Sequence, residues 1–411
     1  MFKKRITPFA CIVISILVCI TTALGVSSYR SVLEKERINQ IRSENGTKTE
    51  DGFISASDAD KYEKLSQLLG RIEGSYIHNY DEDLSWEMIY KAVVQSLGDD
   101  YSLYLTAEEY AAMIDSGKGN FVGIGVHATY DIDTHGVYIF GTMPDSPAEK
   151  AGIQTGDVII EAEGIEASEE NYYKIIDAIP GEAGTEVSIK VLRGEETFDL
   201  KIKRQKVDSE NVLYEKLDNN IAFIRILSFS GTTVSEEFTK KIAKAQSDGC
   251  DKFIFDVRNN GGGYLDEIAG VLDLLLPEGP IINMVDKNGN ISTVDSDANC
   301  IKAPMVVLCN DGTASAAELF TAALRDYDLA KIVGKTTFGK GTLQTTFSVS
   351  DGSAIKLSTA FYNPPKNVSY DKIGIKPDFE VDLKEEWENR FFKMPKEEDT
   401  QLQKAIEVLN S

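Results

Sequence analysis

One stretch decides the fold: Asn310-Asp-Gly-Thr-Ala-Ser-Ala-Ala-Glu-Leu-Phe320. The apolar residues 303–309 before it predict a short buried strand. The Asn-Asp-Gly sequence that follows favours a turn, and the alanine- and leucine-rich run 316–324 predicts a helix. We therefore expect Ser315 at the N-terminus of that helix, where unpaired N–H groups and the helix dipole favour negative charge.

The position of Ser315 allows two interpretations. A hydroxyl at a helix N-terminus can attack a carbonyl carbon and leave an oxyanion beside backbone donors. The same serine can instead be an ordinary N-cap. Because the local sequence fits both, the choice depends on residues farther along the chain.

The second informative stretch is Gly334-Lys-Thr-Thr-Phe-Gly-Lys-Gly-Thr-Leu-Gln344. It nearly matches the phosphate-binding pattern GxxxxGK[ST], but Gly341 replaces the serine or threonine that would bind magnesium. The chain also carries a net charge of −23. We therefore set a nucleotide-binding alternative aside and expect neither a metal ion nor a cofactor.

Lys340 lies between two glycines in this stretch. Burial lowers the pKa of a lysine because desolvation disfavours the charged amine, and a shift from about 10.4 to about 7 requires about 4 kcal/mol. A neutral amine can accept the hydroxyl proton of a serine, as in Ser–Lys variants of the catalytic triad. Gln344 could accept a lysine N–H and fix the direction of the amine. The alternative for Lys340 is a solvated loop cation.

Strands alternate with helices around these two stretches. The sequence predicts strands at 221–226 and 252–258 and helices at 234–245 and 265–275. This alternation indicates a mixed sheet covered by helices. The second strand leads into Asn259-Asn-Gly-Gly-Gly263, and glycine-rich loops at strand ends are where α/β sheets place their ligands.

From residue 119 the pattern changes to short β segments separated by glycine turns. The order of a Gly-Ile-Gly loop at 123–125, a Ser-Pro-Ala run at 146–152 and Gly-Asp at 156–157 resembles a PDZ domain. The resemblance implies that a peptide pairs as an added strand. Its terminal carboxylate would be held by the backbone amides of Phe121, Val122, Gly123, Ile124 and Gly125. The alternative is that these glycines only form a tight turn.

The N-terminus combines Lys3-Lys-Arg5 with an apolar run over about residues 8–26. Such a run is long enough to span a bilayer, and the basic flank keeps the N-terminus inside. We expect a membrane anchor over 1–29 and a linker over 30–58, with the catalytic part extracytoplasmic at the cell membrane. The alternative is a cleaved signal peptide, which would give a secreted protein.

Apolar residues recur at helical spacing between residues 60 and 97 and predict an N-terminal helical region over 59–118. Thr106 followed by Glu109 forms a capping box that starts a further helix. Because such helices can pack on a partner chain, we carry a homodimer as a hypothesis.

Composition limits the class of protein. The chain has 411 residues, enough for two or three domains, and its hydrophobic content of 42% can build packed cores. The strongly negative net charge argues against nucleic acid as a partner. The five cysteines show no CxxC or metal spacing, and the three histidines lie in no catalytic motif.

Several separated motifs, in order, resemble the carboxy-terminal processing (tail-specific) serine proteases. The motifs are the PDZ run, DVRNNGGG at 256–263, TASAAE at 313–318, GKTTFGKGTLQ at 334–344 and GIKPD at 374–378. The resemblance covers roughly residues 90–385. It implies an α+β multidomain protein in which a PDZ domain is attached to a crotonase-like α/β protease core.

By that resemblance Ser315 is the nucleophile, Lys340 the general base and Gln344 its orienting partner. The oxyanion hole would use the backbone amides of Ala316 and Gly262. Two positions depart from the family pattern. Gly261 replaces a usual proline, and the PDZ helix ends in Ile-Pro-Gly at 179–181 rather than in arginine and glycine, so peptide sensing through that arginine is unsupported.

The predicted domains continue with the PDZ domain at 119–204, the serine protease core at 205–384 and a C-terminal helical tail at 385–411. We predict an extracytoplasmic serine endopeptidase that binds a protein or peptide substrate by its free carboxy-terminus. One alternative is a catalytically inactive PDZ scaffold. Another is a different enzyme on the crotonase-like core, such as an acyl-CoA hydrolase, although the PDZ insertion and the export signal argue against it.

Overall fold

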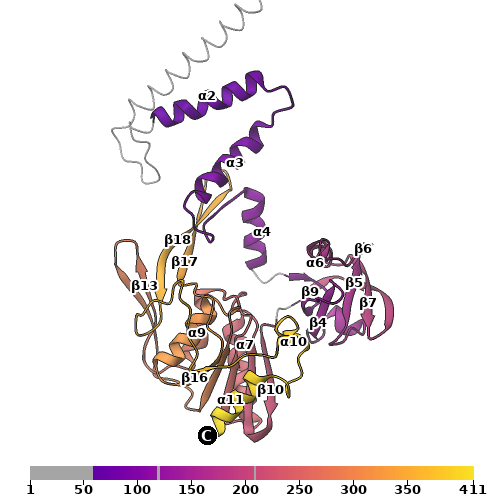
Figure 1. Ribbon diagram of the computed structural model, residues 1–411, viewed down its shortest axis with the longest axis vertical. Helices are drawn as coiled ribbons and strands as arrows, with labels where there is room; N and C mark the ends of the chain where they lie inside the picture. The colour runs from indigo at the N-terminus through magenta and orange to yellow at the C-terminus, as the bar shows by residue number, and fades with distance from the viewer. Residues whose placement is uncertain (1–58, 118–120, 208–209) are drawn as a thin grey trace, which may run out of the picture. The chain divides into compact units, whose positions relative to one another are not determined.

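The computed structural model describes residues 59–117, 121–207 and 210–411 (Figure 1). The chain divides into two compact units, residues 1–88 and 89–411. The predicted anchor and linker lie outside the described residues. Within the described part, no helix has the length and apolar character needed to cross a membrane.

Three helices lie in the predicted N-terminal helical region. Helix α2 spans Ala59–Ser75 and helix α3 spans Glu82–Gln95. Helix α4, Ala107–Gly117, follows the expected capping box. The Glu109 carboxylate accepts a hydrogen bond from the Thr106 N–H (2.8 Å), and the Thr106 hydroxyl accepts one from the Glu109 N–H (3.2 Å).

A six-stranded central sheet forms the predicted protease core. Its order is β10 (Val212–Leu217), β11 (Ile221–Ile226), β12 (Lys252–Asp256), β15 (Met305–Cys309), β16 (Ala330–Gly334) and β19 (Phe379–Glu380). All neighbouring strands are parallel except β10 and β11. Alternate residues of β15 enter different apolar clusters: Val307 packs with one and Val306 with the other. This period of two shows that the sheet is buried on both faces.

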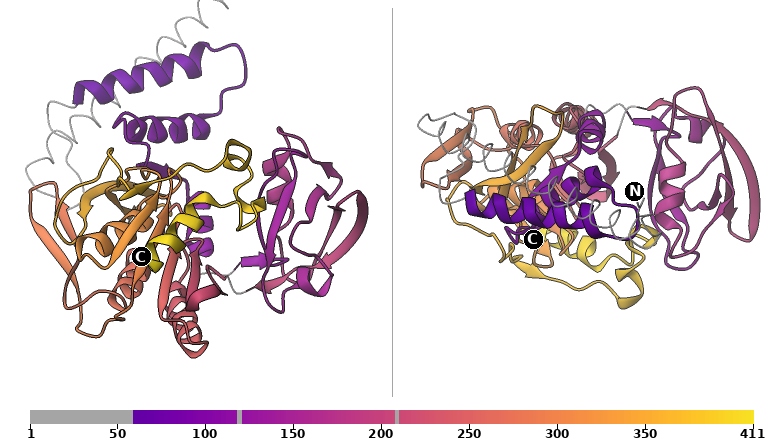
Figure 2. Two further views of the ribbon diagram at one scale, coloured as in Figure 1. Left: turned by 60° about the horizontal axis from the view of Figure 1, so that its bottom comes forward. Right: turned by 90° about the horizontal axis from the view of Figure 1, so that it is seen from above.

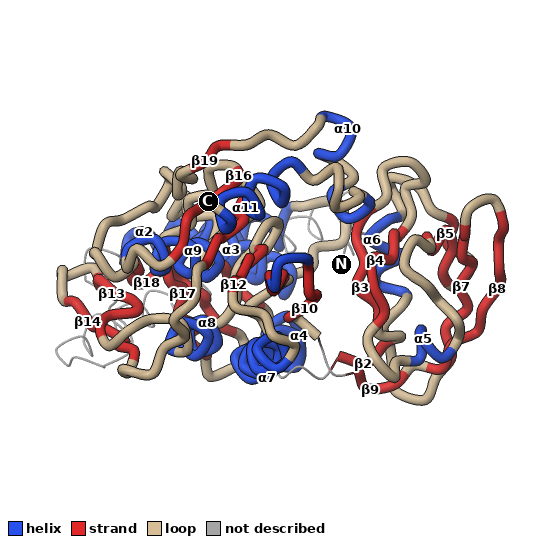
Figure 3. Tube along the Cα trace, turned by 90° about the horizontal axis from the view of Figure 1, so that it is seen from below, coloured by secondary structure: helices blue, strands red, loops and turns tan. Residues whose placement is uncertain are grey.

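Helices cover the two faces (Figures 2 and 3). On one face lie α7 (Val234–Ser247), α8 (Leu265–Asp273) and α9 (Ala316–Asp326), and on the other lies the C-terminal α11 (Thr400–Asn410). Short helical turns are η1 (Asp218–Asn220), α10 (Glu385–Glu388) and η2 (Phe391–Lys393). The expected mixed α/β architecture is thus confirmed.

A second sheet in the core combines residues from distant parts of the chain. Its strands are β1 (Leu103–Leu105), β13 (Gly279–Asp286), β14 (Ile291–Ser296), β17 (Thr342–Ser348) and β18 (Ala354–Asn363). Strand β1 pairs antiparallel with β18, with Leu103 opposite Lys356. The residues just before β1 are therefore held against the protease core.

The PDZ region contains its own sheet in the order β3-β4-β5-β7-β8, with β6 paired to β5. The strands are β3 (Val126–Tyr130), β4 (Val137–Thr142), β5 (Val158–Ala162), β6 (Ile165–Glu166), β7 (Glu186–Arg193) and β8 (Glu196–Lys203). Helices α5 (Pro147–Lys150) and α6 (Tyr172–Ala178) complete it. A separate ribbon pairs β2 (Phe121–Gly123) with β9 (Gln205–Val207).

Candidate active site

Ser315 lies in the turn between buried strand β15 and helix α9, as predicted. Its φ angle is 58°, in the left-handed region that serine rarely adopts. The Ser315 N–H donates to the Glu318 carboxylate (2.9 Å), and the Glu318 N–H donates to the Ser315 carbonyl oxygen (2.9 Å). These bonds hold the serine in a strained turn at the helix N-terminus.

Glu318 connects the serine turn to the lysine loop. Its fully buried carboxylate also accepts hydrogen bonds from the Gly339 N–H (2.7 Å) and the Lys340 N–H (2.7 Å). The Thr337 hydroxyl donates to the same group at 2.5 Å. Sequence reasoning missed this role, although Glu318 is the last residue of the TASAAE motif. One carboxylate therefore fixes the two predicted catalytic segments relative to each other.

Lys340 lies in the loop between β16 and β17, and its side chain is half-buried. Burial, together with the nearby Lys356 ammonium, lowers the pKa of Lys340, while the carboxylates of Asp99 and Glu318 act in the opposite direction. The amine nitrogen lies 4.3 Å from the centre of the Tyr101 ring. Among the described residues, no hydrogen bond joins this amine to Ser315 or Gln344.

Gln344 lies on β17, and its amide nitrogen donates to the carbonyl oxygen of Thr342 (3.1 Å) and to the Ser358 hydroxyl (3.0 Å). The predicted orienting contact with Lys340 is not formed in this arrangement. Ser315, Lys340 and Gln344 thus belong to adjoining parts of the core, and the amine faces Tyr101. Sequence reasoning gave no signal for Tyr101, which reaches the site through the pairing of β1 with β18.

The two predicted oxyanion donors differ in their bonding. The Ala316 N–H has no hydrogen-bond partner in the described part of the chain, so it is available as a donor. The Gly262 N–H instead donates to the Asn260 side-chain oxygen (2.9 Å). Gly262 nevertheless lies directly against the serine turn, because an added Cβ would be 2.6 Å from the Ser315 Cβ. The loop borders the site, while its Gly262 amide is already engaged.

We expect Gly262→Ala to lower kcat about tenfold or more. Gly262 has a φ angle of 100°, and a methyl group there would collide with the serine turn. The backbone strain of about 1–3 kcal/mol would displace Ser315 and so raise the activation barrier. The matched control is Gly261→Ala, since an added Cβ at Gly261 meets nothing within 4 Å. Peptidase rates for the two variants test this, and equal rates would contradict it.

The predicted peptide-binding residues of the PDZ region are divided between a strand and a turn. Residues 121–123 form β2, Ile124 is buried, and Gly125 has a φ angle of 77°. A Cβ at Gly125 would lie 2.5 Å from the Ser146 Cβ, so this position requires glycine. Strand β3 follows at Val126 and lies at the end of its sheet. Its outer edge can accept an additional peptide strand.

The nucleotide-binding alternative does not fit the structure. A phosphate-binding loop leads into a helix, whereas the loop containing Lys340 leads into strand β17. Among the described residues there is also no group of three or more His, Cys, Asp or Glu side chains that could hold a metal ion. Cys309 is fully buried on β15, and burial raises the pKa of its thiol to about 12, which makes it unreactive.

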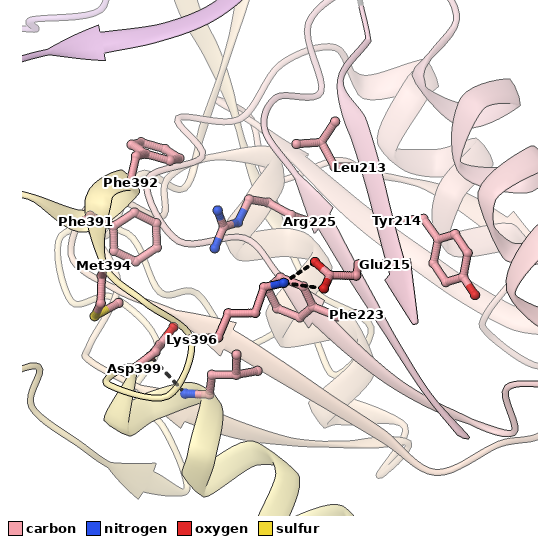
Figure 4. A pocket seen from close by; sticks show the side chains of 11 residues that line it. Leu213, Tyr214, Glu215, Phe223, Arg225, Phe391, Phe392, Met394, Lys396 and Asp399 are labelled. Carbon is pink, nitrogen blue, oxygen red and sulfur yellow. Dashed lines mark hydrogen bonds and ion pairs between the residues drawn. The ribbon is translucent and has the colours of Figure 1, made fainter. Parts of the chain in front are cut away.

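A pocket of about 240 Å³ opens elsewhere in the core (Figure 4). Its lining includes Leu213, Tyr214, Glu215, Phe223, Arg225, Phe391, Phe392, Met394, Lys396, Asp399 and Leu402. None of the predicted catalytic residues lines this pocket. Arg225 projects toward Phe391, and its guanidinium lies 5.2 Å from the centre of that ring while bonded to Asp256. The pocket is therefore lined by residues other than those of the predicted site.

Comparisons with known proteins identify relatives of this chain. The sequence profile of peptidase family S41 matches residues 220–381, and a PDZ domain profile matches residues 141–193. The carboxy-terminal processing protease CtpA of Bacillus subtilis (strain 168) is 36% identical over 336 residues, which are 81% of this chain and 72% of that protein. A probable CtpA-like serine protease of Staphylococcus aureus (strain COL) is 32% identical over 333 residues, which are 80% of this chain and 66% of that protein.

A solved structure shares the fold. The crystal structure of a Bacteroides fragilis protein assigned to the S41 proteases has a TM-score of 0.54 and 18% sequence identity, and the match covers 78% of this chain and 90% of that one. With a relative 36% identical along most of both chains, and with the S41 and PDZ matches in the expected order, the chain belongs to the carboxy-terminal processing serine proteases of peptidase family S41.

Proposed function

We propose that this serine protease cuts peptide bonds with Ser315 as nucleophile and Lys340 as general base. The observation that carries the proposal is the Glu318 carboxylate, which binds the backbone N–H of both residues and so makes one site of two distant segments. The pKa of Lys340 is lowered mainly by burial, and this favours the neutral amine that a base requires.

In the first step the Lys340 amine takes the hydroxyl proton of Ser315 while the serine oxygen attacks the scissile carbonyl. The Ala316 N–H, free at the helix N-terminus, donates to the oxyanion. The carbon–nitrogen bond then breaks, the lysine ammonium protonates the leaving amine, and an acyl-enzyme remains. Water then attacks the acyl carbon while Lys340 takes its proton, the ester bond to Ser315 breaks, and the lysine ammonium returns the proton to the serine oxygen. This reaction requires the amine to leave Tyr101 and approach Ser315, so the described arrangement is a resting one.

The PDZ region supplies substrate recognition in this proposal. The free edge of β3 would pair with the end of the substrate, and the turn at 123–125 would receive the terminal carboxylate. A carboxylate bonded to backbone amides contributes about 1.5–3 kcal/mol. Substrates with a free carboxy-terminus should therefore be preferred to blocked ones.

We expect amidation of a substrate's carboxy-terminus to lower kcat/KM about tenfold or more. The test compares two peptides of one sequence with an apolar end, one carrying a free carboxylate and the other an amide. Binding of both peptides to the Ser315→Ala variant separates capture from cleavage. Equal kcat/KM values would contradict capture by the carboxylate, and binding without any cleavage by the wild type would favour the inactive-scaffold alternative.

The proposed location rests on residues 1–29, where a basic flank precedes an apolar run. We propose that this segment anchors the chain with its catalytic part outside the cytoplasm. Recovery of the intact protein in the soluble cytoplasmic fraction would contradict it.

The exposed apolar side chains of Leu68 and Ile72 on α2, and of Leu84 and Met88 on α3, support a homodimer through these helices. Sedimentation that gives a monomer would rule it out.

A further inference from the structure

A short segment before the PDZ domain reaches the proposed catalytic site. Because β1 pairs with β18, residues 99–102 lie beside β18, and Tyr101 contacts the lysine loop. The Tyr101 ring covers the Lys340 amine at 4.3 Å. Asp99 and Ser102 belong to the same segment, and the Ser102 side chain is buried. The segment contributes side chains to a site whose nucleophile lies more than two hundred residues later.

A chain of hydrogen bonds connects Asp99 to Gln344. The Ser102 hydroxyl donates to the Asp99 carboxylate (2.5 Å), and the Ser358 N–H donates to the Ser102 oxygen (3.1 Å). The Ser358 hydroxyl oxygen in turn accepts from the Gln344 amide nitrogen (3.0 Å). An ionised carboxylate can only accept hydrogen bonds, so Asp99 fixes the direction of the Ser102 hydroxyl and leaves the Ser102 oxygen to accept from the Ser358 N–H.

Asp99 is suited to that role because it stays ionised. Burial alone raises the pKa of Asp99, but hydrogen bonds from Ser102, Ser358 and the Tyr101 N–H, together with the Lys340 charge, lower it below its ordinary value. With its hydroxyl hydrogen directed to Asp99, Ser102 leaves its oxygen to accept from the Ser358 N–H, and this bond holds residue 358 where its own hydroxyl oxygen accepts from Gln344. A neutral residue at position 99 would leave the direction of the Ser102 hydroxyl undefined.

The consequence falls on the side-chain amide of Gln344. Its two N–H groups are used by Ser358 and by Thr342, whose carbonyl and hydroxyl oxygens both lie at 3.1 Å. The Gln344 side-chain carbonyl oxygen is the atom left to accept a hydrogen bond from an N–H of the lysine amine. A lysine held in this way by one N–H can direct its lone pair at a serine hydroxyl.

We propose that Asp99 is a positioning residue for the Lys340 base, acting through Ser102, Ser358 and Gln344. The inference rests on the proposed Ser315–Lys340 chemistry. It assigns to the segment before the PDZ domain the task that the third member of a catalytic triad performs, which is to fix the direction of a hydrogen-bonded partner. Asp99 touches neither substrate nor nucleophile in this role.

The pH dependence gives a readout that a purely structural role would not change. The charged groups that face Lys340 are Asp99 from the segment before β1, Glu318 from α9 and Lys356 from β18, with the Tyr101 ring beside them. Asp99 raises the pKa of Lys340. Removing its charge disfavours the ammonium form, so the pKa falls and the acid limb of the rate profile moves to lower pH.

The test compares Asp99→Asn with Asp100→Asn. Both remove one negative charge, but Asp100 is exposed and lies outside the hydrogen-bond chain. We expect Asp99→Asn to lower kcat about tenfold to a hundredfold, to leave KM within about twofold, and to shift the acid limb to lower pH. Asp100→Asn should match the wild type in all three measurements. Thermal unfolding of each variant checks that the fold is retained.

Ser358 supplies a second variant that leaves the carboxylate in place. Ser358→Ala should lower kcat to a similar degree, Ser358→Thr should restore most of it, and adding Asp99→Asn to Ser358→Ala should cost little more. Wild-type kcat and pH profile in Asp99→Asn, or additive losses in the double variant, would overturn the inference.

Ser315→Ala is measured in parallel. If that variant stays active, the proposed function fails and the inference with it, whereas an inactive Ser315→Ala beside a normal Asp99→Asn rejects the inference alone.

Discussion

Ser315→Ala is expected to lower kcat by about four orders of magnitude or more, since removal of the proposed nucleophile leaves only the proposed oxyanion donors and substrate binding. The change deletes a single hydroxyl at the surface of the turn, and the bonds between the Ser315 backbone and Glu318 remain. Peptide affinity and thermal stability should therefore stay near wild type. Initial rates on a fluorescence-quenched peptide, with binding measured on the same substrate, provide the check.

Lys340→Arg is the matched companion to this variant. Guanidinium keeps a positive charge at all accessible pH values and cannot act as a base, so the variant should be as inactive as Ser315→Ala. The double variant should be no worse than either single one, because the two residues act as a unit. Residual activity above about one per cent in either single variant would contradict the Ser–Lys assignment.

Arg258→Ala is expected to destabilise the protein by about 3–5 kcal/mol, which is the usual cost of leaving buried charges unpaired. The Arg258 side chain is 0% exposed. It donates to Asp256 at 2.8 and 2.9 Å and to Asp399 at 2.8 and 2.9 Å. Asp399 also accepts from the Leu402 N–H at the start of α11, so the variant loosens the C-terminal helix as well. Urea unfolding measures the loss.

Arg225→Ala is the control, because Arg225 pairs with the same Asp256 but is 21% exposed. It should cost only about 1–2 kcal/mol, since Arg258 still neutralises the carboxylate. A loss as large as that of Arg258→Ala would contradict the importance of the buried network.

The loss of unfolding free energy in Arg258→Ala should become smaller as the pH falls. Burial alone raises the pKa of Asp256, but Arg258 and Arg225 outweigh it and hold this pKa at about 2. A lowered folded-state pKa contributes stability above the unfolded value, and that stability is lost as pH falls through the folded one. The difference between wild type and Arg258→Ala should therefore shrink from about pH 4 to about pH 2. A constant difference would show that Asp256 titrates normally.

The sequence predicted the elements around Ser315 because their signals are local. An apolar run, a turn and an alanine-rich run lie next to one another, and helix α9 begins at Ala316 as expected. Lys340 could also be identified from local sequence, because a lysine between two glycines differs from the solvated lysines on helix surfaces. The PDZ order of elements was also readable, because glycine and proline mark each of its turns.

Partners that meet only through tertiary structure could not be predicted. Tyr101 and Asp99 reach the site through the pairing of β1 with β18, which leaves no periodic signal in the sequence. In the sequence, Glu318 is indistinguishable from an ordinary residue of the first helical turn. Its role depends on four hydrogen-bond donors to its carboxylate, most of which lie in the distant lysine loop. Gly262 was expected as an oxyanion donor, but the side chain of Asn260, two residues earlier, accepts its N–H.

The pairing of β1 with β18 also bears on when, during translation, the chain can acquire peptidase activity. Ser102 and Ser358 are bonded across 256 positions, and the whole PDZ domain is translated between them. A ribosome that has completed the PDZ domain has not yet produced Ser315, Lys340 or strand β18, which follows both of them. If Ser315 and Lys340 act as proposed, the nascent polypeptide can therefore cut peptide bonds only after residues 354–363 of β18 have been translated.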